Sequence, residues 1–311
     1  MKRSETHETH IPILSSKLTS MNQLDAKYAG FIDKIEFDVT SQNISTANYK
    51  AFTGTSNLSS IEGFFKNFKA NYQITFNQSN KAYICINPIR SVVTKVIIKP
   101  SSTHNVTELL YIYESLWSYF KLWNAKLRRV DLTIDIKSDF SDTSCGFKVS
   151  YKRAVSNYMS YKQTGIYFGT GEEIIKAYDR REKNPKEINF PCTRIEIQLL
   201  RKKIPTETLS DLFSVLLDNE WHLSKKNPFN KISLNNVLLC VDPDSDKYRT
   251  LFYQLKAMPF SVVKAINNKN RNFDRDYKSA SKLIPNKIQP AEIFRIAIQN
   301  YLNPLIYGEK Q

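Results

Sequence analysis

The chain has 311 residues, with 45 Lys and Arg against 30 Asp and Glu, which gives a formal charge of +15. This length suits one large domain or two smaller ones, and the charge favours a polyanionic partner, with nucleic acid the first candidate and an anionic membrane surface the second. No run of about 18 apolar residues and no apolar leader stand in the sequence, and the four cysteines are far apart, so we expect a cytoplasmic protein with no membrane span and no disulfide framework.

The first half of the chain predicts strands around one long helix. Residues 1–28 are expected to form a loose arm. Strands are predicted at Phe31–Val39, Tyr72–Phe76, Ala82–Ile86 and Val92–Ile98, and a short helix at Ser59–Phe68. Asn105 is a good N-cap, and Glu108 three residues later resembles a capping box, so a helix should run from there to about residue 126.

The stretch from Arg128 to Asp135 is the most informative part of the sequence. Val130, Leu132 and Ile134 alternate with polar residues, which is typical of a half-buried strand. The pleat then places Arg129, Asp131 and Asp135 on one face. Two carboxylates on one strand face repel each other unless a cation or a proton intervenes, which makes this face a candidate metal site.

The second half of the chain predicts more strands and then helices. The expected strands are Phe147–Tyr151, Asn157–Tyr161, Gly165–Gly169, Ile174–Tyr178 and Thr193–Leu200, and the expected helices are Thr208–Leu217, Lys247–Met258, Ser261–Ile266 and Ala291–Tyr301. This order predicts an α+β fold, with a largely antiparallel central sheet that carries the active site, flanking helices and a mostly helical C-terminal part. The expected division is an arm at 1–28, a catalytic domain at 29–235 and a helical region at 236–311.

Three of these strands carry chemically useful side chains. If they are neighbours, Asp131, Asp135 and Glu196 converge with Tyr178 and several basic groups. Carboxylate oxygens suit Mg²⁺ or Mn²⁺, and a tyrosine beside such an ion could attack a phosphodiester. The alternative is that the aspartates are salt-bridged to Arg128, Arg129 or Arg194 on a solvated face.

The order of these motifs resembles the Rep_trans family. The motifs are Arg129-x-Asp131-x-x-x-Asp135, Gly165-Ile166-Tyr167-Phe168-Gly169, Ala177-Tyr178-Asp179-Arg180-x-Glu182 and Arg194-Ile195-Glu196. That family contains replication initiation factors of rolling-circle plasmids and some phages, with related relaxases of conjugative elements. The resemblance implies nicking and religation of one DNA strand at an origin, through a tyrosine nucleophile and a divalent metal.

The resemblance also assigns roles to residues. Tyr178 is similar to the nucleophile, Asp131 or Asp135 together with Glu196 to the metal ligands, and Lys176, Arg180 and Arg194 to the phosphate contacts. The family usually has Arg two positions before the tyrosine and Lys two after it, where this chain has Lys176 and Arg180. Tyr158 and Tyr161 remain rival nucleophiles.

Further basic residues, two of them within these motifs and the others outside, are candidate DNA contacts. They are Arg129, Arg181, Arg201, Lys202, Lys203, Lys269, Arg271 and Arg275. Phe273 and Tyr277 interleave with the last of them, either to stack on unpaired bases or to anchor the segment to the core. The C-terminal helices are a candidate for origin recognition and for contact with a helicase, and a homodimer is an expected assembly.

Two other functions share this charge and fold. One is a DNA-binding regulator without nuclease activity, which does not need the carboxylates. The other is a metal-dependent nuclease that uses water in place of tyrosine.

Overall fold

The computed structural model describes residues 28–40, 58–61, 68–76, 81–88, 95–100, 103–120, 125–150, 154–155, 165–169, 171–186, 188–234, 244–258, 260–267, 270–283 and 289–307. The strands are β1 (Tyr28–Thr40), β2 (Leu58–Ser60), β3 (Phe68–Thr75), β4 (Lys81–Pro88), β5 (Lys95–Pro100), β6 (Lys126–Ile136), β7 (Phe147–Val149), β8 (Ala154–Val155), β9 (Gly165–Phe168), β10 (Glu173–Asp179), β11 (Thr193–Leu200) and β12 (Ile232–Leu234). The helices are α2 (Val106–Phe120), α3 (Phe140–Gly146), α4 (Arg180–Lys183), α5 (Leu209–Leu217), α6 (Asn219–Leu223), α7 (Arg249–Ala257), α8 (Phe260–Ile266), α9 (Arg271–Ser281) and α10 (Pro290–Tyr307), with 3₁₀ turns η5 (Arg201–Lys203) and η6 (Pro228–Lys231).

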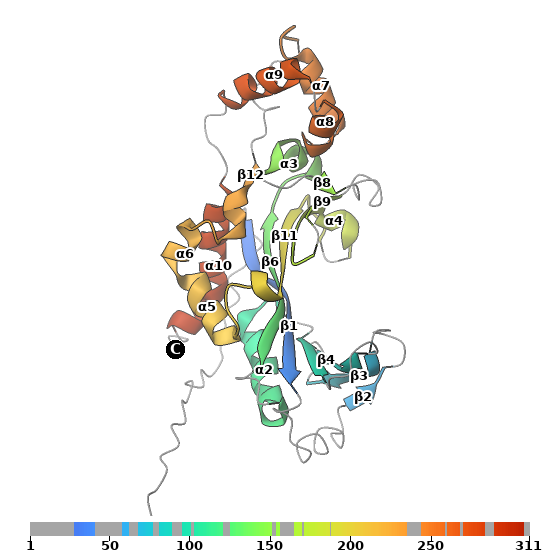
Figure 1. The fold of residues 1–311 in the computed structure, drawn as a ribbon, viewed down its shortest axis with the longest axis vertical. Helices are drawn as coiled ribbons and strands as arrows, with labels where there is room; N and C mark the ends of the chain where they lie inside the picture. The colour runs from blue at the N-terminus through green and yellow to red at the C-terminus, as the bar shows by residue number, and fades with distance from the viewer. Residues whose placement is uncertain are drawn as a thin grey trace, which may run out of the picture.

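Ten of the strands form one sheet in the order β2-β3-β4-β5-β1-β6-β11-β10-β9-β8, and β12 pairs with β7 in a second small sheet. Every pairing is antiparallel. The predicted α+β class with a largely antiparallel sheet is confirmed, as is the mostly helical character of the C-terminal part (Figure 1). No helix among the described ranges is both long enough and apolar enough to cross a membrane.

The apolar face of the sheet packs against helices. Val130, Leu132 and Ile134 of β6 join one large buried cluster with residues of α2, α5 and α10. Helix α10 contacts β1 directly, and Gly30 permits this approach, because a Cβ built on Gly30 lies only 2.7 Å from the Cβ of Ala297. The larger core therefore covers one face of the sheet, and the opposite face carries the polar side chains.

Strand β1 carries an irregularity that shapes the polar face. Ile32 pairs with Leu132 and Lys34 pairs with Asp131, so Asp33 is one extra residue in β1. A β-bulge of this kind bends the strand and redirects side chains. As a result Asp33 and Lys34, although adjacent in sequence, both line the same cavity on the polar face.

Helices α7, α8 and α9 have a small core of their own, built from Leu251, Leu255, Phe260, Val263, Phe273, Tyr277 and Ala280. They lie at the end of the molecule beyond α3 and β12, away from β2, β3 and β4 (Figure 1). Phe273 and Tyr277 are buried in this core. Of their two predicted roles, the structure therefore supports anchoring, not base stacking.

Several predicted elements need correction or lie outside the described ranges. Ser59–Phe68 was expected to be a helix, but its described ends belong to strands β2 and β3. No separate helix was predicted where α9 lies, and only the basic residues of that segment were singled out. Three predictions lie outside the described residues: most of the proposed arm, the strand at 157–161 with Tyr158 and Tyr161, and Lys269 as a DNA contact. The division at residue 235 stays a prediction; Phe294 and Ile298 of α10 belong to the larger core.

Candidate active site

The three strands that carry the predicted chemistry are neighbours. β6 pairs with β11, and β11 pairs with β10. The register places Arg194 opposite both Asp135 and Tyr178, and Glu196 opposite Lys176. Because side chains opposite each other on one face lie within reach, the sheet brings these groups onto one surface, as predicted.

Tyr178 and Glu196 form the centre of this surface. The Tyr178 hydroxyl donates to Glu196 Oε2 at 2.8 Å, and Lys176 Nζ donates to Glu196 Oε1 at 2.6 Å. Burial, together with the charge of Glu196, raises the pKa of Tyr178. Burial also disfavours the charged form of Glu196, but the charge and hydrogen bond of Lys176 outweigh it and lower the pKa of that carboxyl. At neutral pH the pair is therefore a phenol beside an ionised carboxylate.

Asp135 belongs to a chain of ion pairs that crosses the sheet. Arg194 Nε lies 2.6 Å from Asp135 Oδ1, and Arg194 Nη2 lies 2.9 Å from Asp135 Oδ2, a bidentate pair. Arg194 Nη1 lies 2.5 Å from Asp33 Oδ1, which also lies 3.0 Å from His104 Nε2. Arg180 contacts Asp135 from α4. Burial disfavours the charged form of Asp33, but the hydrogen bond with His104 and the charge of Arg194 outweigh it and lower its pKa.

Asp131 is paired separately. Arg129 Nε donates to Asp131 Oδ1 at 2.8 Å, and Arg129 Nη2 lies 2.5 Å from Oδ2. The carboxyl is fully buried. Burial and the nearby charge of Glu196 raise its pKa to about 6 against the pull of Arg129. The buried Asp131 therefore holds the Arg129 side chain in place, and Asp131 itself offers no exposed oxygen.

The three carboxylates predicted as metal ligands do not share a set of available oxygens. Both oxygens of Asp131 and of Asp135 accept from arginines, and both oxygens of Glu196 accept from Lys176 and Tyr178. A guanidinium at hydrogen-bond distance also repels a divalent cation. Among the described residues, no group of three or more His, Cys, Asp and Glu side chains is arranged to hold a metal. The arrangement as it stands does not fit Mg²⁺ or Mn²⁺.

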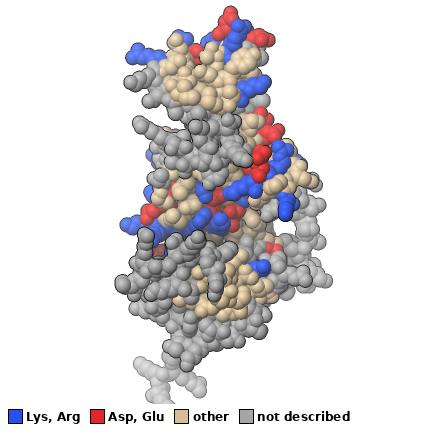
Figure 2. Space-filling model, turned by 90° about the vertical axis from the view of Figure 1, so that its right-hand side faces the viewer, with Lys and Arg blue, Asp and Glu red and all other residues tan. Residues whose placement is uncertain are grey.

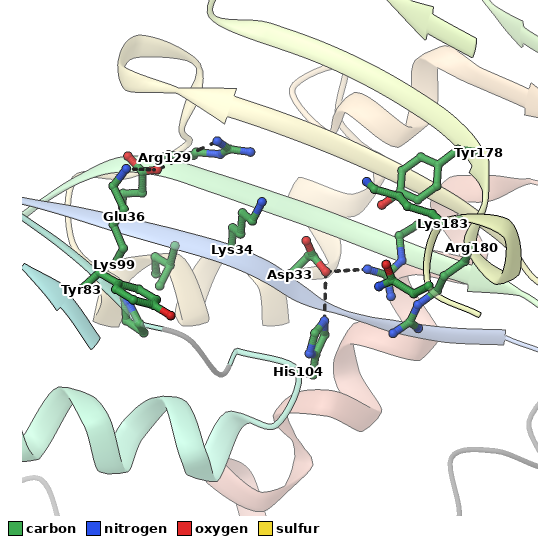
Figure 3. Close-up of a pocket in the computed structure, with 14 residues that line it drawn as sticks. Asp33, Lys34, Glu36, Tyr83, Lys99, His104, Arg129, Tyr178, Arg180 and Lys183 are labelled. Carbon is green, nitrogen blue, oxygen red and sulfur yellow. Dashed lines mark hydrogen bonds and ion pairs between the residues drawn. The ribbon is translucent and has the colours of Figure 1, made fainter. Parts of the chain in front are cut away.

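A cavity of about 590 Å³ opens over this face. Its charged lining is mostly basic, namely Lys34, Lys99, Arg129, Arg180, Lys183 and Arg194 against the carboxylates of Asp33 and Glu36. Tyr178, Arg180 and Lys183 form one end, and Tyr83, Lys99, Glu36 and Arg129 form the other (Figure 3). Across the middle of this side of the molecule, Lys and Arg side chains stand among Asp and Glu (Figure 2). Such a cavity suits an extended polyanion.

Helix α4 follows the tyrosine strand directly and covers Tyr178. Asp179 is its N-cap and accepts from the backbone N–H of Glu182 at 3.1 Å. The short turn brings Lys183 Nζ to 4.0 Å from the centre of the Tyr178 ring. Only 5% of the surface of Tyr178 is exposed, yet the residue lines the cavity. The ring is thus held between a cation above and a carboxylate at its hydroxyl.

Some predicted DNA contacts lie outside this cavity. Arg181 lies on α4, 3.9 Å from Asp139. Arg201, Lys202 and Lys203 are exposed in η5, at the end of β11 remote from Arg194. Arg271 and Arg275 are exposed on α9. The cavity therefore brings together Arg129, Tyr178, Arg180 and Arg194 of the predicted residues.

Several residues that line the cavity were not predicted from the sequence. They are Asp33, Lys34, Glu36, Tyr83, Lys99, His104 and Lys183. For β1 the sequence did hold a sign of the bulge. The carboxylates at 33, 36 and 38 are spaced by three and then two residues, which departs from strict two-residue alternation near the bulge at Asp33. No local signal placed His104 or Tyr83, because their positions depend on contacts between distant segments.

Comparisons with known proteins give only a distant likeness to solved structures. No protein-family model and no curated protein matches the sequence. Among solved structures, one that matches is a rolling circle replication initiator protein from Geobacillus stearothermophilus, at 10% identity and a TM-score of 0.40. The match covers 75% of this chain and 98% of that chain. A likeness this remote carries no argument about function.

Proposed function

We propose that the protein is a rolling-circle replication initiator that nicks and rejoins one strand of origin DNA through a covalent 5′-phosphotyrosine. The observation that carries this proposal is the hydrogen bond of 2.8 Å from the Tyr178 hydroxyl to Glu196 at the end of a basic cavity. A nucleophile within hydrogen-bond reach of a base is the arrangement that covalent catalysis needs. The motif order shared with the Rep_trans family supports the same proposal.

The proposed reaction uses Tyr178 and Glu196 directly. The Tyr178 oxygen attacks the phosphorus while its proton passes to Glu196 Oε2. The bond between phosphorus and the 3′-oxygen breaks, and that oxygen leaves with the electron pair and takes a proton from water in the cavity. The products are a free 3′-OH and a 5′-phosphate linked to Tyr178. The reverse sequence rejoins the strand.

Basic side chains at this end of the cavity have an electrostatic role in the proposal. Lys183 and Arg180 line the cavity beside Tyr178, where they can bind the non-bridging oxygens of the scissile phosphate. Arg194 is fixed by Asp135 and Asp33, so it is already oriented before DNA arrives. Preorganised positive charge of this kind stabilises the negative charge that develops on the phosphoryl oxygens without a reorganisation cost.

The role of Glu196 differs from the one the sequence predicted. Glu196 was expected to bind a metal, and its contacts here favour a base that takes the tyrosine proton. No step of the proposed reaction depends on a divalent ion, and Mn²⁺ is included in the assay below only as a component of the buffer that can be omitted. Contacts with a helicase and assembly into a homodimer remain predictions.

An adduct assay tests the proposal. Wild-type protein is incubated with labelled single-stranded origin DNA and Mn²⁺ and run on a denaturing gel. We expect a covalent adduct that is lost in Tyr178→Phe and retained in Tyr83→Phe, the matched control at the other end of the cavity. Glu196→Gln should slow adduct formation by about 10² to 10⁴, the usual contribution of a general base, while DNA binding persists.

Other outcomes assign other functions. Nicking without an adduct indicates a nuclease that uses water, and DNA binding without nicking indicates a regulator. An adduct that persists in Tyr178→Phe shows that another tyrosine is the nucleophile, and Tyr158 and Tyr161 are then the first variants to make.

A further inference from the structure

We propose that the end of the cavity formed by Tyr83 and Lys99 is a separate subsite for single-stranded DNA, where an unpaired base stacks on the Tyr83 ring. This inference rests on the proposed function, because it concerns another part of the strand that Tyr178 attacks. It adds a binding contact far from the reacting phosphate.

The subsite is built from directly paired strands. Tyr83 of β4 lies opposite Lys99 of β5, so the ring and the ammonium group project from the same face. Lys99 Nζ lies 3.3 Å from Glu36 Oε1, and Arg128 Nε lies 3.6 Å from Glu36 Oε2. The carboxylate is thus neutralised by its neighbours, and the region keeps a positive balance.

The two ends of the cavity are far apart. From β4 to β10 the sheet order β4-β5-β1-β6-β11-β10 spans five strand spacings. At about 4.8 Å each, this is about 24 Å across the strands. At the stacked spacing of about 3.4 Å per nucleotide, the distance corresponds to about seven nucleotides. Lys34, exposed between the two ends, supplies a charge along the way (Figure 3).

The chemistry of the subsite favours unpaired nucleotides. A basic groove follows the phosphate backbone, and an aromatic face accepts any base, which is the usual combination in proteins that bind single strands. A duplex keeps its bases stacked on each other and offers no base face to Tyr83. We therefore commit to single-stranded DNA as the ligand.

The test measures affinity for the oligonucleotide (dT)20 with the full-length chain. In a Tyr178→Phe background, Tyr83→Leu should weaken binding by about tenfold, the typical loss of one base stack. Tyr83→Trp should restore affinity because it keeps an aromatic face. Tyr111→Leu removes an exposed tyrosine on α2 outside the cavity and should leave the affinity unchanged.

The outcomes separate this inference from the proposed function. Equal affinity of Tyr83→Leu and its parent for (dT)20 overturns the subsite, whatever the adduct assay shows. A tenfold loss in Tyr83→Leu that Tyr83→Trp does not restore also overturns base stacking. If the adduct survives in Tyr178→Phe while Tyr83→Leu still lowers affinity, the nucleophile assignment fails and the subsite stands.

Discussion

Lys176 Nζ lies 2.6 Å from Glu196 Oε1. The other oxygen of this carboxylate, Oε2, accepts a hydrogen bond from the Tyr178 hydroxyl. Lys176 and Glu196 are directly opposite each other on β10 and β11. The contact of Lys176 with phosphate stays a prediction, and its position also gives it a part in the electrostatics of Glu196. The lysine lowers the pKa of Glu196 and so keeps the proposed base ionised in spite of burial.

Replacement of Lys176 by Met should shift the pH dependence of adduct formation. The base works only when ionised, so the rate falls as the pH drops through the pKa of Glu196. Removal of the lysine charge leaves burial to raise that pKa, and the acid limb of the profile should therefore move to higher pH. Single-turnover rates between pH 4 and 8 measure this. An acid limb that does not move in Lys176→Met would show that another group controls it.

The sequence predicted the strands of the site well, and its salt-bridge alternative named Arg129 and Arg194 among the partners of the aspartates, where the structure has them. Alternation in β6 and β11 identified the faces that carry Asp131, Asp135 and Glu196, because a strand with one apolar side has only one register of burial. Alternation does not show which polar groups meet. The bidentate pair between Arg194 and Asp135 depends on the order of strands in the sheet, and it occupies both oxygens of a carboxylate that the sequence proposes as a metal ligand.

The misses have similar physical causes. Ser59–Phe68 has phenylalanines at helical spacing, yet the ends that the structure describes pair within the sheet as parts of β2 and β3, and residues 62–67 lie outside the described ranges. Helix α9 was not predicted because its charges obscured the apolar positions Phe273, Tyr277 and Ala280, which are four and three residues apart and face a small separate core.

Divalent metal should leave the stability of the DNA-free protein unchanged. A ligand that binds only the native state raises the unfolding temperature once its concentration exceeds its Kd, but each candidate carboxylate is already paired with a basic or hydroxyl group. We expect EDTA-treated protein to show the same unfolding temperature with and without millimolar Mn²⁺. A rise that disappears in Asp131→Ala or Glu196→Ala would contradict this expectation and restore the metal site predicted from the sequence.

Helix α9 should contribute to the salt dependence of DNA binding. Its exposed residues Arg271, Arg275 and Lys278, together with Lys282 at its C-cap, fall within about 60° of one another around the helix axis at 3.6 residues per turn. Such a stripe can follow a phosphate backbone. Arg271→Gln and Arg275→Gln should each reduce the slope of log K against log salt by about 0.9 on duplex DNA, if each arginine contacts one phosphate.

The control for that measurement is Lys126→Gln. Lys126 is also exposed and, like Arg275 with Asp276, has an ion-pair partner, Glu207 at 2.9 Å, but it lies on β6 and not on α9. Its replacement should leave the slope unchanged. Equal slopes for wild type and both arginine variants would remove α9 from the proposed DNA interface, while the cavity assays would be unaffected because Arg271 and Arg275 do not line it.

Gly30→Ala should destabilise the fold without touching the site. A Cβ at position 30 would lie 2.7 Å from Ala297 Cβ and 3.3 Å from the Ala297 carbonyl carbon, so β1 and α10 would have to separate. Overpacking of this kind costs about 1–3 kcal/mol of the free energy of unfolding. Urea unfolding measures the loss. Ala297→Gly removes the nearest atom, so the double variant Gly30→Ala/Ala297→Gly should be more stable than the sum of the two single losses predicts. Strict additivity would show that the strain at Gly30 arises elsewhere.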